Sequence, residues 1–272
     1  MKKIFDNTLL TNRSYLFSLL NGLDTITLRI KRLTIGTMSG THRPEMGVMY
    51  PFSLATSSLF GQIIWNNTMQ KLFLFDFDGV LVDSLDVYER RVKLCLEKIG
   101  TPIVQSRDDF LELFEDNFYE GIVKKGIDLA AFMNASRAIP TKDDYDQIEL
   151  FAPIFPVLHA LKKDNILTVI SSNVSRVINA ILARYGFNGC FRKVLGADFG
   201  YSKEEKILHA MNLFRTEKDR TYYVGDTIGD IKEARMAGVK TVAVTWGWHS
   251  KEKLETINPD YLIETPDDLL KI

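Results

Sequence analysis

Two aspartates, Asp76 and Asp78, stand at the end of a short apolar run, Leu72 to Phe75, and Gly79 follows them directly. A carboxylate at such a place can act as a nucleophile, and a second carboxylate two residues later can move a proton for the same reaction. Asp78 can turn back over the same pocket only where the chain bends, which a glycine permits. The spacing predicts phosphoryl transfer, with Asp76 attacking and Asp78 as acid and base.

Polar side chains also follow a second apolar run. Ser171, Ser172 and Asn173 come directly after residues 167–170. Because the carboxyl ends of parallel strands meet at one edge of a sheet, we expect their hydroxyls and backbone amides to lie beside Asp76 and hold phosphate oxygens. The simpler interpretation is a helix cap supplied by Ser172 or Asn173. Capping and phosphate binding can occur together at one helix start.

A third buried run is followed by Asp226 and Asp230, four residues apart across a strand-to-helix turn. Carboxylate oxygens so placed suit a hard Mg²⁺ ion, although Asp230 alone would also favour a helix N-terminus. Lys203, in the turn before another helix, would neutralise a phosphoryl group and the Asp76 carboxylate. Lys206 is a nearby alternative, and most lysines are simply solvated. The occurrence of all these residues after strands or at helix starts indicates a catalytic site more strongly than any one of them alone.

Strand and helix patterns alternate along most of the chain, which predicts an α/β fold with right-handed crossovers and a parallel sheet. The predicted strands cover residues 72–75, 166–170, 193–195, 221–224, 241–244 and 261–263. The predicted helices between them cover residues 157–163, 174–185, 203–214 and 228–237. Helical spacing at 85–99, 110–123 and 129–138 predicts an all-helical insertion at about 84–150.

These residues resemble the haloacid dehalogenase-like hydrolase superfamily, whose first motif looks like Asp76-Phe-Asp78-Gly79-Val and whose second motif ends in serine or threonine. The resemblance covers about residues 69–272. Within the superfamily, the chain looks like the phosphoglycolate phosphatase branch at residues 225–239 and 244–247. The resemblance implies a Rossmann-like parallel sheet with helices on both faces, and a helical cap that excludes water.

The resemblance also implies roles for single residues. Asp76 would be the nucleophile that forms an aspartyl-phosphate, Asp78 the general acid and base, and Lys203 the electrostatic clamp. Ser171 would bind the phosphate, with Ser172 and Asn173 beside it. The expected Mg²⁺ ligands are Asp76, Asp78, Asp226 and Asp230. Trp246, Trp248 and His249 follow the strand at 241–244 and would line the mouth of the site, although aromatic residues there more often pack in the core.

Three parts are expected along the chain: an amino-terminal extension at 1–68, a core of 69–83 and 151–272, and a helical cap at 84–150. The extension holds 3 acidic and 7 basic residues, which gives it a local charge of +4. Since the net charge of the whole chain is −1, the remaining residues carry a charge of −5. We expect either that the extension is disordered or that translation starts at Met69, so that the residues before it are not part of the protein. An organelle-targeting arm or a partner-binding segment is the alternative.

Composition excludes several other classes. The chain has 272 residues, of which 46% are apolar, so it can bury a sizeable core. Its net charge is close to zero, whereas a protein that binds nucleic acid usually carries an excess of basic residues. The two cysteines, Cys95 and Cys190, lack the spacing of a zinc site or a disulfide framework, which favours a reducing cytoplasm. No apolar stretch is long enough to span a membrane. The expected partner is a small phosphorylated metabolite, and the oligomeric state stays open.

The favoured function is a Mg²⁺-dependent phosphatase for a small phosphomonoester, with 2-phosphoglycolate, a sugar phosphate, a nucleotide and pyrophosphate all open as substrates. A phosphomutase of the β-phosphoglucomutase kind uses the same paired aspartates but must keep water from the aspartyl-phosphate. The sequence Asp83-Ser84-Leu85, without a nearby histidine, resembles hydrolases better. A non-catalytic binding protein on the same scaffold is the third alternative, and the intact set of acidic residues argues against it.

Overall fold

The structure, a computed structural model, describes residues 70–140, 145–187 and 189–272. The predictions made for the extension at 1–68 therefore lie outside the described residues. The division into core and cap stays a prediction.

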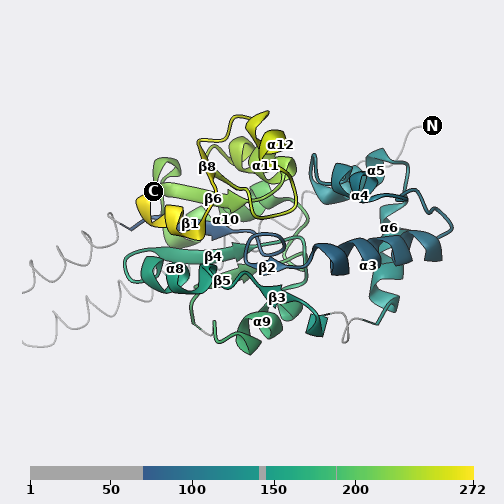
Figure 1. Cartoon of the computed structure of the whole chain (residues 1–272), viewed down its shortest axis with the longest axis horizontal. Helices are drawn as coiled ribbons and strands as arrows, with labels where there is room; N and C mark the ends of the chain where they lie inside the picture. Colours follow the sequence, from purple (N-terminus) through teal and green to yellow (C-terminus); the bar gives the residue numbers. More distant parts are fainter. Residues whose placement is uncertain (1–69, 141–144, 188) are drawn as a thin grey trace, which may run out of the picture. The chain divides into compact units, whose positions relative to one another are not determined.

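A six-stranded parallel sheet forms the centre of the fold (Figure 1). Its strands in chain order are β1 (Leu72–Phe75), β4 (Ile166–Ile170), β5 (Lys193–Leu195), β6 (Thr221–Gly225), β7 (Lys240–Val244) and β8 (Tyr261–Ile263). In space they run β5-β4-β1-β6-β7-β8. The order reverses between β1 and β6, and open α/β sheets bind ligands at the carboxyl ends of the strands where the order reverses.

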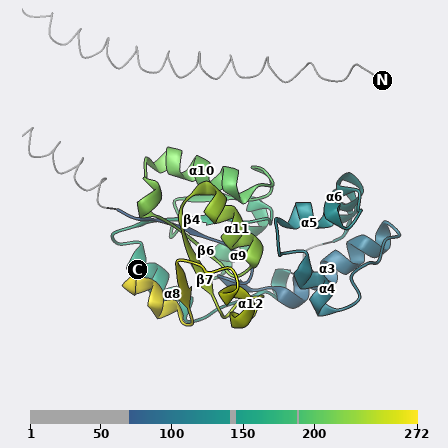
Figure 2. The ribbon, with the colours of Figure 1, turned by 90° about the horizontal axis from the view of Figure 1, so that it is seen from above.

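Helices cover both faces of this sheet (Figure 2). They are α8 (Ile154–Leu161), α9 (Ser175–Arg184), α10 (Lys203–Phe214), α11 (Ile228–Ala237) and the short α12 (Lys251–Glu255), with 3₁₀ turns at η1 (Lys218–Arg220) and η2 (Pro266–Lys271). Side chains alternate along β1, so that Phe73 and Phe75 pack against α8 and α9. Leu72 and Leu74 pack against α10 and α11. All four side chains are fully buried, which confirms the prediction of a central strand covered on both sides.

Four helices, here called the helical segment, follow β1 and gather at the carboxyl edge of the sheet (Figure 1). They are α3 (Leu85–Lys98), α4 (Arg107–Glu112), α5 (Phe118–Lys124) and α6 (Leu129–Ala138). The segment has a hydrophobic cluster of its own, which contains Leu96, Phe110 and Ile122.

Two expectations for residues 84–150 are wrong in detail. The pattern at 110–123 is not one helix, because α4 ends at Glu112 and α5 begins at Phe118. The insertion is also not purely helical. Its end forms the two-residue strand β3 (Glu149–Leu150), which pairs antiparallel with β2 (Val82–Asp83). These two strands carry the chain out of the sheet and back, and two residue pairs are too short a pattern to be recognised in a sequence.

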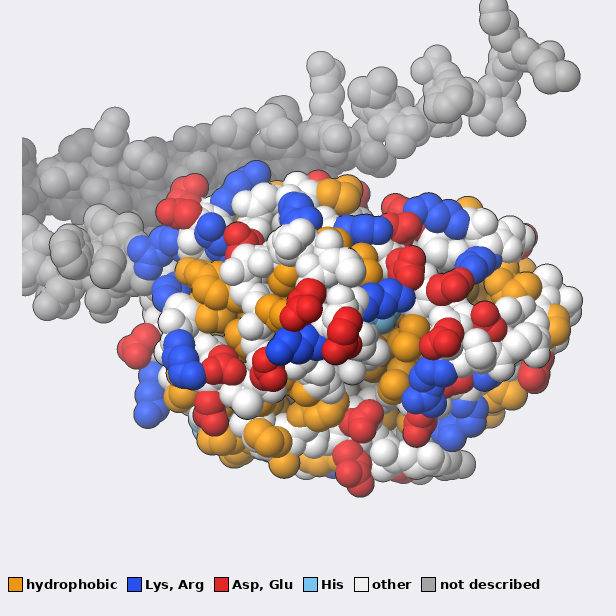
Figure 3. Space-filling view, turned by 45° about the horizontal axis from the view of Figure 1, so that its top comes forward, with side chains coloured by type: hydrophobic (Ala, Val, Ile, Leu, Met, Phe, Trp, Pro, Cys, Tyr) orange, Lys and Arg blue, Asp and Glu red, His pale blue; other side chains and the backbone are white. Residues whose placement is uncertain are grey.

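Basic and acidic side chains are interspersed on the face of the molecule shown in Figure 3. Among the described residues, several such side chains form ion pairs, for example Lys232 with Asp116 at 2.7 Å and Lys253 with Glu115 at 2.7 Å. Among the helices of the described residues, none has the length and apolar character needed to cross a membrane.

Candidate active site

Asp76 lies at the carboxyl end of β1 and is 6% exposed. Its backbone N–H donates to the Val224 carbonyl at 2.9 Å, which ties the end of β1 to β6. Its Oδ1 accepts a hydrogen bond from the Phe77 N–H, and its Oδ2 accepts one from Lys203 Nζ, both at 2.7 Å. Burial raises the pKa of Asp76 to about 7, although Lys203 opposes that shift. The carboxylate is held in one orientation and faces the pocket.

The chain bends after Asp78, as the sequence predicted. Gly79 has φ +77°, and a Cβ atom there would overlap the Asp226 carboxylate, so the turn requires glycine. The bend brings the Asp78 carboxylate to the same pocket, where its Oδ1 accepts a hydrogen bond from Ser84 Oγ at 2.8 Å. Burial raises the pKa of Asp78 to about 6, although the Ser84 hydrogen bond opposes that shift. Asp78 can therefore exchange a proton near neutral pH.

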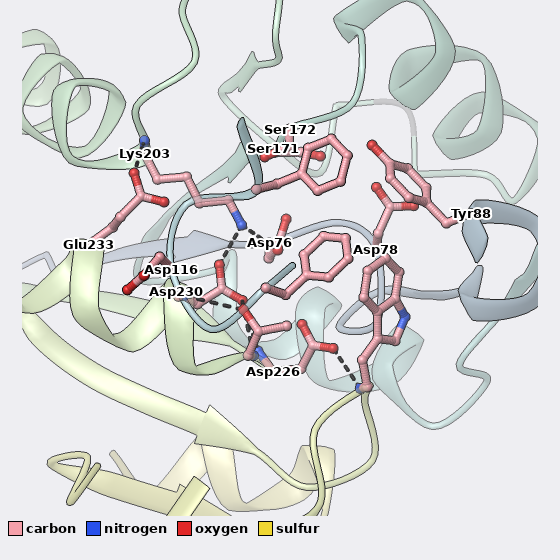
Figure 4. Close-up of a pocket in the computed structure, with 15 residues that line it drawn as sticks. Asp76, Asp78, Tyr88, Asp116, Ser171, Ser172, Lys203, Asp226, Asp230 and Glu233 are labelled. Carbon is pink, nitrogen blue, oxygen red and sulfur yellow. Dashed lines mark hydrogen bonds and ion pairs between the residues drawn. The ribbon is translucent and has the colours of Figure 1, made fainter. Parts of the chain in front are cut away.

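The choice between the two candidate lysines follows from their contacts. Lys203, the first residue of α10, reaches between Asp76 and Asp230 and donates to both carboxylates (Figure 4). Lys206 lies one turn later and donates instead to the Ser171 carbonyl at 2.7 Å. Lys203 is thus the lysine that contacts Asp76.

Asp226 and Asp230 lie on either side of the start of α11. Asp230 Oδ2 accepts a hydrogen bond from the Thr227 N–H at 3.1 Å, and the Asp230 N–H donates to Thr227 Oγ1 at 3.2 Å, so the two residues form a capping box. Asp226 Oδ2 accepts one from the Trp248 N–H at 2.7 Å. Burial raises the pKa of Asp226 well above its usual range. Burial is also the largest effect at Asp230, but Lys203 and the hydrogen bonds from Thr227 together outweigh it and lower the Asp230 pKa.

Three carboxylates, those of Asp76, Asp226 and Asp230, come together in this way. One oxygen from each lies within 4.8 Å of the other two, and all three residues are buried. Asp226 Oδ1 is also buried and makes no hydrogen bond. With all groups ionised, three negative charges face the single positive charge of Lys203, which leaves a charge of −2. Buried carboxylates with spare oxygens and unbalanced charge fit a hard divalent cation.

The Asp78 carboxylate does not belong to this group of three oxygens. Its place in the metal set therefore stays a prediction. Its polar neighbours are Ser84, Asn173 and Ser171, and each of them opposes the rise of the Asp78 pKa.

The residues after β4 also reach the pocket. Ser171 Oγ accepts a hydrogen bond from the Asn173 N–H at 2.9 Å, and its hydroxyl lies beside the Asp78 carboxylate. Ser172 lies beside it in the pocket wall, and its carbonyl accepts from the Tyr119 hydroxyl at 2.8 Å. Asn173 is buried and lies just beyond this wall, in the adjoining cavity. Its Oδ1 accepts from the N–H of Val174, the residue before α9, at 2.8 Å, so Asn173 satisfies an amide at the helix start, whereas Ser172 does not cap the helix.

Aromatic side chains from the helical segment close the pocket (Figure 4). Tyr88, Phe114 and Phe118 line it together with Trp248, and the rings of Phe114 and Trp248 are 4.8 Å apart. The region of the pocket in which the centre of a water molecule could lie has a volume of about 20 Å³. That is room for little more than one water, so a substrate enters only if the segment moves.

The helical segment is docked on the first turns of α11. The Gly229 N–H donates to the Phe114 carbonyl at 2.9 Å. The Asn117 amide donates to Glu233 Oε1 at 3.0 Å, and the same oxygen accepts from the Lys203 N–H at 2.7 Å. The loop that separates α4 from α5 is therefore linked through Glu233 to the start of α10.

His249 also joins the two parts and does not face the pocket. Its Nδ1 accepts a hydrogen bond from the Ile228 N–H at 3.0 Å, and its Nε2 lies 3.1 Å from the Leu111 carbonyl. Trp246 donates from Nε1 to the Val80 carbonyl at 3.2 Å. Of the three residues expected at the mouth, Trp248 alone lines the pocket.

Several residues of the pocket wall were not predicted from the sequence: Tyr88, Phe114, Asp116, Phe118 and Glu233. Glu233 lies three residues after Asp230 on α11, a spacing that places both side chains on one face of a helix, and this could have identified it. The other four belong to the helical segment, and no spacing in the sequence connects them to the aspartates.

A buried acidic site at the carboxyl edge of a parallel sheet, with a helical segment over it, defines an α/β enzyme. The sequence model of the haloacid dehalogenase-like hydrolases matches residues 73–244, more than half of the chain. The chain therefore belongs to this family, and the prediction of a haloacid dehalogenase-like hydrolase is confirmed.

Curated relatives and solved structures agree with this assignment. The chain is 28% identical over 201 residues to a phosphoglycolate phosphatase of Synechococcus elongatus, covering 73% of this chain and 94% of the relative. It is 26% identical over 204 residues to the pyrophosphatase PpaX of Listeria monocytogenes, covering 73% of this chain and 94% of the relative. A crystal structure of a predicted phosphatase from Clostridium acetobutylicum has the same fold, with a TM-score of 0.66 and 22% identity over 75% of this chain and 97% of that one.

Proposed function

We propose that the protein is a Mg²⁺-dependent phosphatase that hydrolyses a small phosphomonoester through an aspartyl-phosphate on Asp76. The observation that carries the proposal is the convergence of Lys203 on Asp76 beside two further carboxylates, one of which leaves a buried oxygen unpartnered. A carboxylate that attacks a phosphate dianion meets like-charge repulsion, and positive charge at this point reduces it.

In the first step, a carboxylate oxygen of Asp76 forms a bond to phosphorus while the bond from phosphorus to the leaving oxygen breaks. Lys203, already 2.7 Å from Asp76 Oδ2, offsets the charge that gathers between nucleophile and phosphoryl group. The Ser171 hydroxyl donates to a phosphoryl oxygen. Asp78 gives its proton to the leaving oxygen, so that the product departs as a neutral alcohol.

In the second step, water attacks the phosphorus of the aspartyl-phosphate. Asp78, now ionised, takes a proton from this water, and the bond between Asp76 and phosphorus breaks. Orthophosphate leaves, and both carboxyl groups return to their starting states. The aromatic side chains over the pocket limit the water that reaches the intermediate to a small number of molecules.

Asp76, Asp226 and Asp230 would hold the Mg²⁺ ion, because their oxygens converge and their charge is not balanced. When bound, the ion would stabilise negative charge on the phosphoryl oxygens.

The relatives suggest where to begin with substrates. A phosphoglycolate phosphatase stands among them, which makes 2-phosphoglycolate the first candidate, and a pyrophosphatase makes pyrophosphate the second. The cysteines Cys95 and Cys190 are both buried free thiols, which supports a reducing compartment, so we place the protein in the cytoplasm.

The test is phosphate release from a panel of phosphomonoesters and pyrophosphate, with Mg²⁺ or with a chelator. We expect release that requires Mg²⁺ and falls at least about a thousandfold in Asp76→Asn, because the nucleophile is lost. Asp83→Asn, at an exposed aspartate of β2, is the matched control and should behave as wild type. Transfer of the phosphoryl group to a second hydroxyl, without release, would replace the phosphatase by a mutase. No reaction from folded protein would overturn both.

A further inference from the structure

Two further cavities lie next to the pocket around Asp76, between the helical segment and the core. Tyr88, Phe118 and Ser172 line both the pocket and a second cavity of about 90 Å³. Arg91 and Tyr145 line both this second cavity and a third one of about 600 Å³. The shared residues place the three spaces in a row, with the pocket at one end and the third cavity at the other.

The second cavity adjoins the pocket on the side of Asp78, where a leaving group would lie. Tyr88 lines both spaces (Figure 4). Asn173, in the wall of the second cavity, is 5% exposed, and its side chain lies against the Asp78 carboxylate.

Among the described residues, more basic than acidic side chains line the third cavity, here called the outer chamber. They are Arg91, Arg137 and Arg176, with Asp198 as the one described carboxylate. Asp198 already accepts a hydrogen bond from the Ser175 N–H at 2.7 Å.

The three arginines differ in how far they are committed within the protein. Arg91 is buried, donates to the Pro140 carbonyl at 3.0 Å and lies over the Tyr145 ring, so it forms part of the wall. Arg137 donates to the Asn134 amide oxygen at 3.0 Å. Arg176 is exposed, and none of the described carboxylates forms an ion pair with it. Arg137 of α6 and Arg176 of α9 both line the outer chamber.

We propose that the substrate is a phosphomonoester with an extended leaving group that carries a second phosphate, or a group of similar charge, bound in the outer chamber by Arg137 and Arg176. The proposal rests on the proposed function, and it adds the substrate class. A glycolate leaving group would fill the second cavity at most, whereas the outer chamber has the size of an ordinary ligand pocket. Guanidinium groups bind phosphate oxygens in pairs, which suits a terminal phosphate.

The experiment compares α,ω-alkanediol bisphosphates of increasing length with the matching alkyl monophosphates and with 2-phosphoglycolate. We expect kcat/KM for the bisphosphates to exceed that of the monophosphates by about fivefold to tenfold at the lengths that reach the outer chamber. The double variant Arg137→Ala/Arg176→Ala should lose this preference and hydrolyse the monophosphates within about twofold of wild type. Arg192→Ala/Lys193→Ala removes two exposed positive charges outside the three cavities and should keep the preference.

Binding is measured as well, because it does not depend on turnover. Calorimetry with Asp76→Asn should show the same preference for bisphosphates, lost when Arg137→Ala/Arg176→Ala is added. A chain that hydrolyses the monophosphates but shows no preference at any length, or keeps it in the double variant, would overturn this inference alone. A folded chain that releases phosphate from none of the substrates would overturn the proposed function and this inference with it.

Discussion

Lys203 and Lys206 lie one turn apart on α10, and their surroundings make them opposite in character. Burial lowers the pKa of both lysines, but at Lys203 the carboxylates of Asp230 and Asp76 outweigh it and raise the pKa well above its usual value. Lys206 has a backbone carbonyl as its hydrogen-bond acceptor. Burial, helped by the charge of Lys203, therefore lowers the pKa of Lys206 to about 8 from 10.5. Lys206 donates a hydrogen bond to the Ser171 backbone, and its buried charge lowers the free energy of unfolding while the ammonium group is protonated.

The variant Lys206→Met tests this cost. Between pH 8 and 10.5 the unfolded chain binds more protons at this residue than the folded chain, so the free energy of unfolding rises with pH in that window. The rise contributed by Lys206 is at most about 3 kcal/mol. Urea unfolding at pH 7.5 and pH 10 should show a smaller rise in Lys206→Met than in wild type. An exposed lysine changed in the same way, Lys163→Met, should leave the rise intact, and equal rises in all three proteins would contradict the prediction.

The first turn of α11 is the element on which the helical segment docks. A Cβ atom at Gly229 would overlap the Asp116 carbonyl and lie 2.9 Å from the Phe114 carbonyl. We expect Gly229→Ala to push the loop between α4 and α5 away, and with it Phe114 and Asp116 of the pocket wall. The fold should survive, since alanine is the better helix former by about 1 kcal/mol.

Steady-state kinetics and hydrogen exchange measure this effect. Gly229→Ala should lower kcat/KM by about tenfold or more, because misplaced contacts over the site are costly, and should speed exchange in α5. In Gly200→Ala the new Cβ meets only Glu205 Oε2, at 3.8 Å, so this control should match wild type. Unchanged kinetics and unchanged exchange in Gly229→Ala would show that docking on α11 does not close the pocket.

The elements differ in how well the sequence predicted them. Helices α6, α10 and α11 have the predicted bounds, since the side chains of Asp128, Ser202 and Thr227 cap them and such signals are local. The residues of the site that follow strands were foreseen for a similar reason, because parallel strands end at one edge. The break between α4 and α5 was not foreseen, because the contact of Phe114 with α11 depends on the tertiary fold.

Three carboxylates, those of Asp76, Asp226 and Asp230, are buried in the whole molecule around the single ammonium group of Lys203. Asp226 and Asp230 stand on the core, and residues of the helical segment cover them. Folding without a cation must therefore bring three carboxylates and one ammonium group out of water together. Metal binding and folding stability are coupled through this cluster.

Thermal unfolding of the whole chain tests this coupling without reference to turnover. Mg²⁺ in hundredfold excess over its dissociation constant should raise the free energy of unfolding by about 3 kcal/mol, because the ion binds the folded cluster and not the unfolded chain. Asp226→Asn should lose most of this response. It should also be more stable than wild type in chelator at pH values where unfolded aspartate is ionised, because the amide is neutral, whereas burial disfavours the ionised form of Asp226, and because the amide keeps an oxygen for the Trp248 N–H. Asp267→Asn, at an exposed aspartate, should respond to Mg²⁺ as wild type does. If Asp226→Asn kept the full response to Mg²⁺, the ion would bind outside this cluster. If the variant were less stable than wild type in chelator, the charge of Asp226 would already be balanced within the protein.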